Sequence, residues 1–202
     1  MRLALATSAL ALCLLLTQLT GFTPAERPAP RDTSQDWSLQ PGDVVLRHGN
    51  GLWSGVFARL NSRDRRFSHA GVVVREGMDW YVIHAEADNL GRNGTVRMDE
   101  WEVFAGQARQ MAVLRVSDSG SAARTAEAAA IMHRDALPFD FSFDLTRRDA
   151  VYCSELVWRA LSEALQRDPL PQKPVLHGRD AILVENLLLD LPELDLVYLS
   201  DG

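Results

Sequence analysis

The sequence predicts an α+β domain in which a mainly antiparallel sheet packs against one amphipathic helix that begins at Cys153. Two β-rich runs, 69–75 and 80–85, are joined by the short stretch EGMD, which predicts a hairpin. Further extended runs follow in the chain and are flanked by helical stretches, which favours an antiparallel sheet. Apolar residues after Cys153 repeat at helical spacing and predict the helix that covers this sheet.

The elements of the first half follow from local patterns. The stretch QPGDVVL predicts a turn and then a short strand over residues 44–47. Apolar residues at helical spacing predict a short helix between residues 52 and 60. The hairpin comes next, with Gly77 in its tight turn. The stretch GTVRMDEWEVF predicts a strand followed by a helical turn that starts near Asp99.

The second half is predicted in the same way. After a strand in RQMAVLRVS, the Ala-rich residues 121–133 predict a helix with Ser119 or Ser121 as its N-cap. The stretch LPFDFSFDLTRRDAVY alternates aromatic residues with aspartates and is predicted to be extended. The next helix begins at Cys153 and ends before Pro169. We expect an irregular stretch and a short helix after it, and LDLVYLS predicts a last strand.

The N-terminus has the pattern of a secretory signal peptide. Arg2 is followed by an apolar run over residues 3–16, which is shorter than the roughly 20 apolar residues of a membrane-spanning helix. We therefore expect a signal peptide over 1–25, a linker over 26–37 and a single domain over 38–202. The chain is expected to be exported to the periplasm or the extracellular space and to associate with the cell envelope.

The charge balance bears on the partners of the chain. The formal net charge is -6 at pH 7, and removal of a signal peptide that holds Arg2 and no acidic residue would make it more negative. A nucleic acid needs a basic footprint, so it is not an expected partner. We expect a monomer that contacts a membrane at most peripherally, and no motif in the sequence calls for a cofactor or a metal.

Cys153 is the candidate nucleophile. Loss of the signal peptide removes Cys13, so Cys153 would be the sole cysteine of the exported chain, without an intramolecular disulfide partner. At a helix N-terminus, free N–H groups and the helix dipole favour a thiolate and also suit the oxyanion of an attacked carbonyl. The alternative is a small buried core cysteine. The residues that share its helix face are Leu156, Val157, Ala160, Leu161, Ala164 and Leu165.

The hairpin supplies a candidate base. His69 opens its first strand and shares a face with Gly71, which would leave room for a helix end to approach the sheet. A base that activates a thiol is itself oriented by a third polar group. The tight turn brings the end of the second strand opposite His69, so His84 is the preferred orienting residue and Glu86 the second choice. The hairpin pattern does not separate these two.

Four stretches, PGDVVL, FSHAGVVV, YVIHAE and FDLTRRDAVYCSELVW, occur in this order over roughly residues 39–165. They resemble the circularly permuted papain-like branch of the NlpC superfamily, the YiiX/YebB-like cysteine hydrolases. The resemblance implies a circularly permuted papain-like (NlpC-type) fold with Cys153 as nucleophile, His69 as base and His84 as the polar residue on the following strand. It also implies acyl transfer from an amide or ester through a thioester, on a cell-wall peptide or a lipid-linked acyl group.

Other classes of function stay open. His69, His84 and Cys153 could bind zinc with one free coordination position, although no short ligand spacing joins the two histidines. A non-catalytic binding domain of the same fold is a further alternative, and a thioester passed to another acceptor would make the enzyme an acyltransferase. Tyr152 is a candidate supporting residue, either through its hydroxyl in an oxyanion pocket or by packing in the site.

Overall fold

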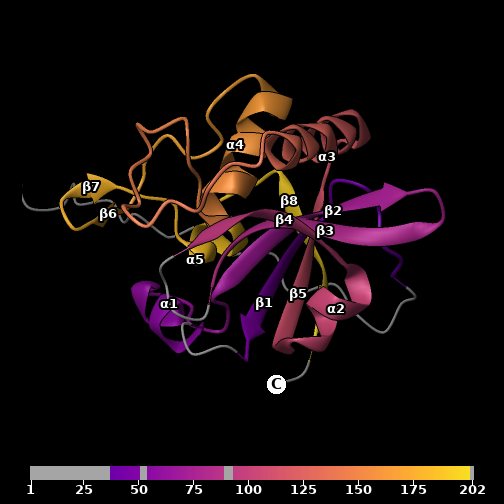
Figure 1. The fold of residues 1–202 in the computed structure, drawn as a ribbon, viewed down its shortest axis with the longest axis horizontal. Helices are drawn as coiled ribbons and strands as arrows, with labels where there is room; N and C mark the ends of the chain where they lie inside the picture. The colour runs from indigo at the N-terminus through magenta and orange to yellow at the C-terminus, as the bar shows by residue number, and fades with distance from the viewer. Residues whose placement is uncertain (1–36, 51–53, 89–92, 201–202) are drawn as a thin grey trace, which may run out of the picture.

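The computed structural model describes residues 37–50, 54–88 and 93–200 (Figure 1). The predicted signal peptide over 1–25, and the predicted linker up to residue 36, lie outside these residues. Six strands form one antiparallel sheet in the order β4-β3-β2-β1-β5-β8, which confirms the predicted α+β class. Within the described ranges, no helix has both the length and the apolarity to cross a bilayer.

The first half of the chain contains most of the sheet. Its elements are β1 (Val44–Gly49), α1 (Ser54–Leu60), β2 (His69–Glu76), β3 (Asp79–Ala87), β4 (Gly94–Glu100) and α2 (Trp101–Gly106). The predicted hairpin is confirmed as β2 and β3, and Gly77 in its turn has a φ of +61° that glycine adopts without strain. The helical turn predicted to start near Asp99 begins later, because Asp99 still pairs with Val82 of β3.

The second half contributes the covering helices. Its elements are β5 (Ala108–Val116), α3 (Ser119–Arg134), α4 (Cys153–Leu165), β6 (Val175–Leu176), β7 (Arg179–Asp180), α5 (Val184–Leu189) and β8 (Leu194–Leu199). The predicted serine caps of α3 are wrong. Asp118 is its N-cap, because this carboxylate accepts the Ser121 backbone N–H. The short β6–β7 hairpin was not expected from the sequence.

The stretch over residues 137–152 is not the extended segment that the sequence predicted. It consists of short turns and irregular backbone, with two isolated bridges, Thr95↔Pro138 and Phe139↔Val151. Asp140 is fully buried, and its carboxylate accepts the backbone N–H groups of Ser142 and Asp144. These hydrogen bonds within a few residues fold the chain back on itself and prevent an extended strand.

The sheet is covered on both faces. Helices α3 and α4 lie over one face and α2 lies over the other (Figure 1). Leu156 and Leu161 of α4 are fully buried against the sheet, and burial of each side chain contributes about 1.5–3 kcal/mol. The smaller core under α2 contains Phe104. The predicted packing of the Cys153 helix on the sheet is therefore confirmed.

The central hairpin opens at one end. The pairing of β2 with β3 ends at Val72↔Ile83, while β2 continues back to His69 and β3 runs on to Ala87. Gly71 lies at the opening, and a Cβ atom there would come within 2.5 Å of Val82 Cγ1 and 3.1 Å of His84 Cβ. Gly71 therefore makes room for the neighbouring strand β3, and not for the end of a helix as the sequence suggested.

Candidate active site

The N-terminus of α4 meets the sheet where the hairpin opens. Cys153 is half-buried there, and its sulfur accepts a hydrogen bond from the backbone N–H of Ala70, the residue after His69. Cys153 and His69 line the same cavity, whose volume is about 160 Å³. The structure thus places both side chains at one cavity, although they are far apart along the chain.

His69 begins a chain of polar contacts that runs across three strands. Its Nε2 atom lies 2.8 Å from Nδ1 of His84, and the two rings are nearly perpendicular at 89°. His84 is fully buried, and its Nε2 atom lies 3.2 Å from Oδ2 of Asp99 on β4. Asp99 also pairs with Arg97 at 2.7 Å. Asp99 was not predicted as a site residue.

The hydrogen bonds determine which ring nitrogens carry protons. The hydrogen bond from His84, together with Arg97, lowers the pKa of Asp99 to about 2, so this carboxylate is ionised and only accepts. His84 must then carry its proton on Nε2, and its Nδ1 accepts the Nε2 proton of His69. We therefore assign the free lone pair of His69 to Nδ1.

Both histidines are neutral at physiological pH. Burial lowers the pKa of His69 well below its usual value, and the nearby charge of Arg47 lowers it further. Burial also lowers the pKa of His84, against the opposing effect of Asp99. A neutral His69 is able to accept a proton, which is what a general base requires.

Glu86 has different partners from those of His84. Its carboxylate accepts from Arg47 Nη2 at 2.8 Å and lies 3.5 Å from Arg97 Nη1. It is 4.0 Å from Nδ1 of His84. The geometry thus separates the two residues that the sequence left open, because His84 contacts the His69 ring by a hydrogen bond while Glu86 pairs with arginines.

Tyr152 supports the wall of the cavity. Its hydroxyl accepts the backbone N–H of Ile182 at 2.8 Å, and its ring lies against Phe143 with centroids 4.9 Å apart. Ser154 binds the same residue by donating to the Ile182 carbonyl at 2.7 Å. Burial raises the pKa of Tyr152, so its hydroxyl stays protonated. The contacts of Tyr152 are those of a residue that packs in the site and holds the segment before α5 in place.

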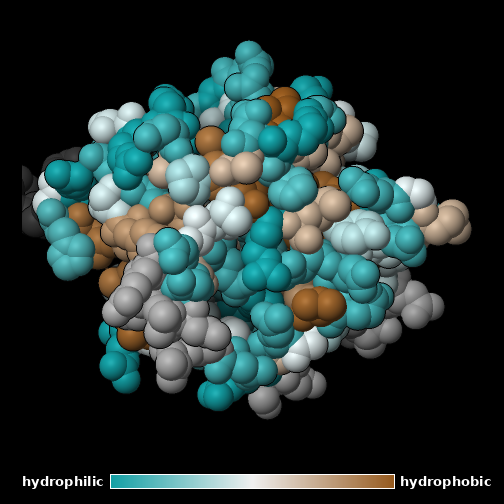
Figure 2. Space-filling model, viewed as in Figure 1, coloured by the Kyte–Doolittle hydropathy of each residue, from teal (hydrophilic) through white to brown (hydrophobic). Residues whose placement is uncertain are grey.

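The cavity has an apolar part and a polar part. The apolar part is formed by α1, the loop before α4 and the segment before α5, and its side chains are Phe57, Leu60, Phe139, Phe143, Ile182, Leu183 and Val184. The polar part includes Arg47, Ser54, Ser68, Glu86 and Gln107. In the space-filling view, hydrophilic residues occupy the middle of the face of the molecule that is shown, and hydrophobic residues border them toward α4 (Figure 2).

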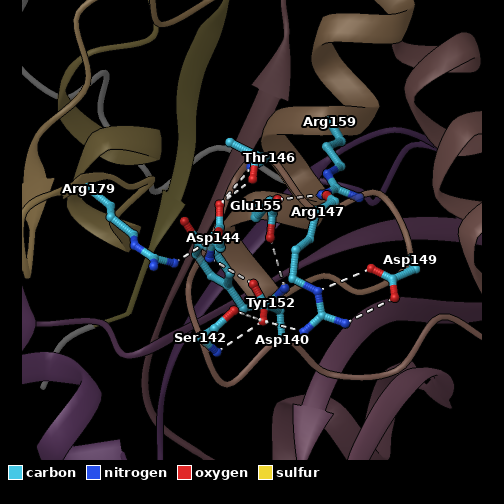
Figure 3. A network of polar contacts seen from close by, with 10 residues as sticks. All are labelled: Asp140, Ser142, Asp144, Thr146, Arg147, Asp149, Tyr152, Glu155, Arg159 and Arg179. Carbon is cyan, nitrogen blue, oxygen red and sulfur yellow. Dashed lines mark hydrogen bonds and ion pairs between the residues drawn. The ribbon is translucent and has the colours of Figure 1, made fainter.

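A polar network around the buried carboxylate of Asp140 holds the loop that carries Phe139 and Phe143. Figure 3 shows Asp140 at its centre, with Arg147 extended between Asp140 and Asp149. Asp140 also accepts from the hydroxyl of Ser142 at 2.5 Å. The network ties this loop to itself immediately before Cys153, and it therefore positions two aromatic rings of the cavity wall.

The zinc alternative requires three free ligands. Among the described residues, the group that could hold a metal is His69, His84 and Glu86, whose ligand atoms lie within 4.8 Å of one another, and Cys153 is not part of it. The two histidines share a hydrogen bond, and Glu86 is engaged by the guanidinium of Arg47. A metal would have to displace both contacts and bind beside a positive charge, so these residues do not fit a resident metal.

Burial gives the thiol an unusual pH dependence. It raises the pKa of Cys153 to about 11, although hydrogen bonds from Ala70 and Ser154 act in the opposite direction. The helix N-terminus alone predicted a lowered thiol pKa, so burial is the larger effect.

We expect alkylation of Cys153 by iodoacetamide to be slow at pH 6 and to accelerate up to about pH 11, because the thiolate fraction grows over that range. Rate constants from mass spectrometry test this, and a fast plateau between pH 5 and pH 7 would contradict it.

Comparisons with known proteins agree with this architecture. The chain is 28% identical to YiiX, an uncharacterized protein of Escherichia coli strain K12, over 130 residues, which are 64% of this chain and 60% of that protein. It shares a fold with the structure described as metalloprotein YiiX from Escherichia coli O157:H7, with a TM-score of 0.66 and 20% identity, covering 82% of this chain and 100% of that one. Residues 38–177 match the permuted papain-like amidase enzymes of the YaeF/YiiX type, the C92 family. Because this match spans more than half of the sequence, the chain belongs to the permuted papain-like amidase family C92.

Proposed function

We propose that this protein is a cysteine amidase in which Cys153 is the nucleophile and His69 the general base. The observation that carries the proposal is the position of the Cys153 thiol at a helix N-terminus, in the same cavity as a neutral His69. The membership in an amidase family supports the reaction class. The catalytic assignment rests on the chemistry of these side chains.

The reaction begins from a neutral thiol and a neutral imidazole. The sulfur of Cys153 attacks the acyl carbonyl carbon while Nδ1 of His69 takes the thiol proton. The oxyanion of the tetrahedral intermediate receives hydrogen bonds from backbone N–H groups at the start of α4. His69 then donates its proton to the leaving nitrogen, the C–N bond breaks, and an amine and a thioester on Cys153 result. Water attacks the thioester with His69 as base, which releases the carboxylic acid and restores the thiol.

His84 and Asp99 orient the base in this scheme. The ionised carboxylate of Asp99 keeps the His84 proton on Nε2, and His84 in turn keeps the His69 proton on Nε2. Nδ1 of His69 therefore has its lone pair available before catalysis begins. When His69 becomes an imidazolium, the same hydrogen bond to His84 persists and stabilises the added charge.

The apolar part of the cavity supports a substrate in which the carbonyl that Cys153 attacks carries a hydrocarbon chain. The aromatic rings of Phe57 and Phe143 lie 6.2 Å apart between centroids and both line the cavity. Such walls bind a hydrocarbon better than the charged and hydroxylated parts of a cell-wall peptide. We therefore favour a lipid-linked or other acyl amide over a muropeptide, and we propose that the enzyme acts as an exported protein at the cell envelope.

A series of N-acyl amides of increasing chain length tests the proposed function. We expect kcat/KM to rise by about fourfold for each added methylene, because burial of each CH₂ contributes about 0.8 kcal/mol, until the cavity is full. Purified muropeptides serve as the comparison, and mass spectrometry detects the released amine. Hydrolysis of muropeptides alone would contradict the acyl substrate, and binding without any amine release would support the non-catalytic alternative.

A further inference from the structure

Arg47 is a buried cation in the wall of the cavity. Its side chain is 3% exposed, Nη1 donates to the Phe104 carbonyl at 3.0 Å, and Nη2 donates to Glu86 at 2.8 Å. Its Nε–H group is buried and has no hydrogen-bond partner among the residues that the structure describes. A buried donor without an acceptor costs about 1–3 kcal/mol, so such a group calls for an explanation, and a ligand is one.

Gly49 and Ser54 lie beside this donor. Gly49 follows Arg47 by two residues on the same face of β1, and a Cβ atom there would lie 3.9 Å from Arg47 Nε and 2.6 Å from the hydroxyl of Ser54. Arg47, Gly49 and Ser54 all line the cavity that contains Cys153. A side chain at residue 49 would therefore collide with Ser54, and glycine there lets the Ser54 hydroxyl lie close to the Arg47 guanidinium.

A carboxylate matches these two donors. It has two oxygen atoms, so one can accept from the Nε–H group while the other accepts from the Ser54 hydroxyl. Arg47 also lies directly opposite His69 in the pairing of β1 with β2, so a ligand held there is close to the candidate base. An uncharged amide would offer a single, weaker acceptor in the same place.

We propose that Arg47 and Ser54 bind a carboxylate of the substrate, and that the substrate class is therefore an N-acyl amino acid. This inference rests on the proposed function, because the acyl chain is taken to occupy the apolar part of the same cavity. The carboxylate and the hydrocarbon chain would then be recognised by different parts of one cavity.

Matched substrates test the inference. N-decanoylglycine carries the carboxylate, and N-decanoylglycine N-methylamide replaces it with a neutral group. We expect the wild-type kcat/KM for decanoate release to be about 100-fold higher for the carboxylate, because a site built for a polar group strongly rejects an analogue that lacks it. We expect this ratio to approach one in Arg47→Gln and to fall about tenfold in Ser54→Ala. Arg59→Gln, which removes an exposed positive charge from α1, should leave the ratio unchanged.

The outcomes separate the inference from the proposed function. A wild-type ratio near one with both substrates hydrolysed would overturn the carboxylate site and leave the amidase intact. Equal losses for both substrates in Arg47→Gln would also overturn it, since Arg47 would then serve the oxyanion or the fold. If neither substrate is hydrolysed, calorimetric binding to the Cys153→Ala protein decides: about 100-fold tighter binding of the carboxylate supports the site, and equal binding excludes it. If Arg47→Gln does not fold, Ser54→Ala gives the same decision.

Discussion

Replacement of Cys153 by alanine is expected to abolish amide hydrolysis, with a fall in kcat of about 10⁵-fold or more, because Cys153 is the sole cysteine among the residues that the structure describes and a thioester needs a thiol. The fold should survive the change. The thiol is half-buried and small, and its loss leaves mainly the Ala70 N–H group without an acceptor. That loss costs about 1 kcal/mol, which corresponds to a decrease in Tm of about 2–4 °C for a domain of this size.

Cys153→Ser is the matched control for this experiment. Its hydroxyl oxygen can accept the Ala70 N–H group, so we expect a Tm nearer that of the wild type. Its activity should still be lost, because a serine hydroxyl is far harder to deprotonate than a thiol and the site has been arranged for sulfur. Turnover that persists in both variants would end the assignment of Cys153 as nucleophile.

Replacement of Asp99 by asparagine is expected to lower kcat by about 10²- to 10⁴-fold with little change in KM, because it reverses the proton order in the histidine pair. The new amide group can donate to Nε2 of His84, which then carries its proton on Nδ1, facing His69. Nε2 of His69 must then accept a hydrogen bond from this N–H group, so the proton of His69 moves to its Nδ1. The lone pair that the reaction needs is then absent from the side of the thiol.

A spectroscopic readout distinguishes this effect from simple loss of structure. Nitrogen chemical shifts of His69 should show the proton on Nε2 in the wild type and on Nδ1 in Asp99→Asn. Arg97→Gln is the control, because it removes a partner of Asp99 and keeps the carboxylate on His84. We expect it to retain the wild-type tautomer. An unchanged tautomer together with unchanged kcat in Asp99→Asn would show that Asp99 does not position the base.

The site residues that the sequence did not predict are those whose contacts depend on the pairing of separate strands. Asp99 was taken as the start of a helix, yet it shares a face of β4 with Arg97, and the register His84↔Arg97 brings it within reach of His84. Arg47 was seen only as the end of a short strand. Its register opposite His69 shows its place in the site. The registers in which β1 and β4 pair with the hairpin would have identified both residues.

The sequence by itself determined the α+β class, the hairpin and the helix that begins at Cys153. These follow from spacings of two to four residues, which depend on the local chain alone. It also singled out Cys153, His69 and His84, partly through resemblance to a family. It was wrong for residues 137–152, where alternating aromatic and acidic residues imitate a strand while Asp140 folds them into turns.

Only the tertiary structure decided how these groups are protonated and what surrounds them. The opening between β2 and β3 and the contact of Asp99 with His84 both depend on residues from separate strands. The Nε–H group of Arg47, which has no hydrogen-bond partner among the described residues, depends on the packing around β1. The direction of the Cys153 pKa shift depends on burial, which outweighs the helix N-terminus seen in the sequence. Burial is a property of the packed chain, because it depends on every element that excludes water from the site.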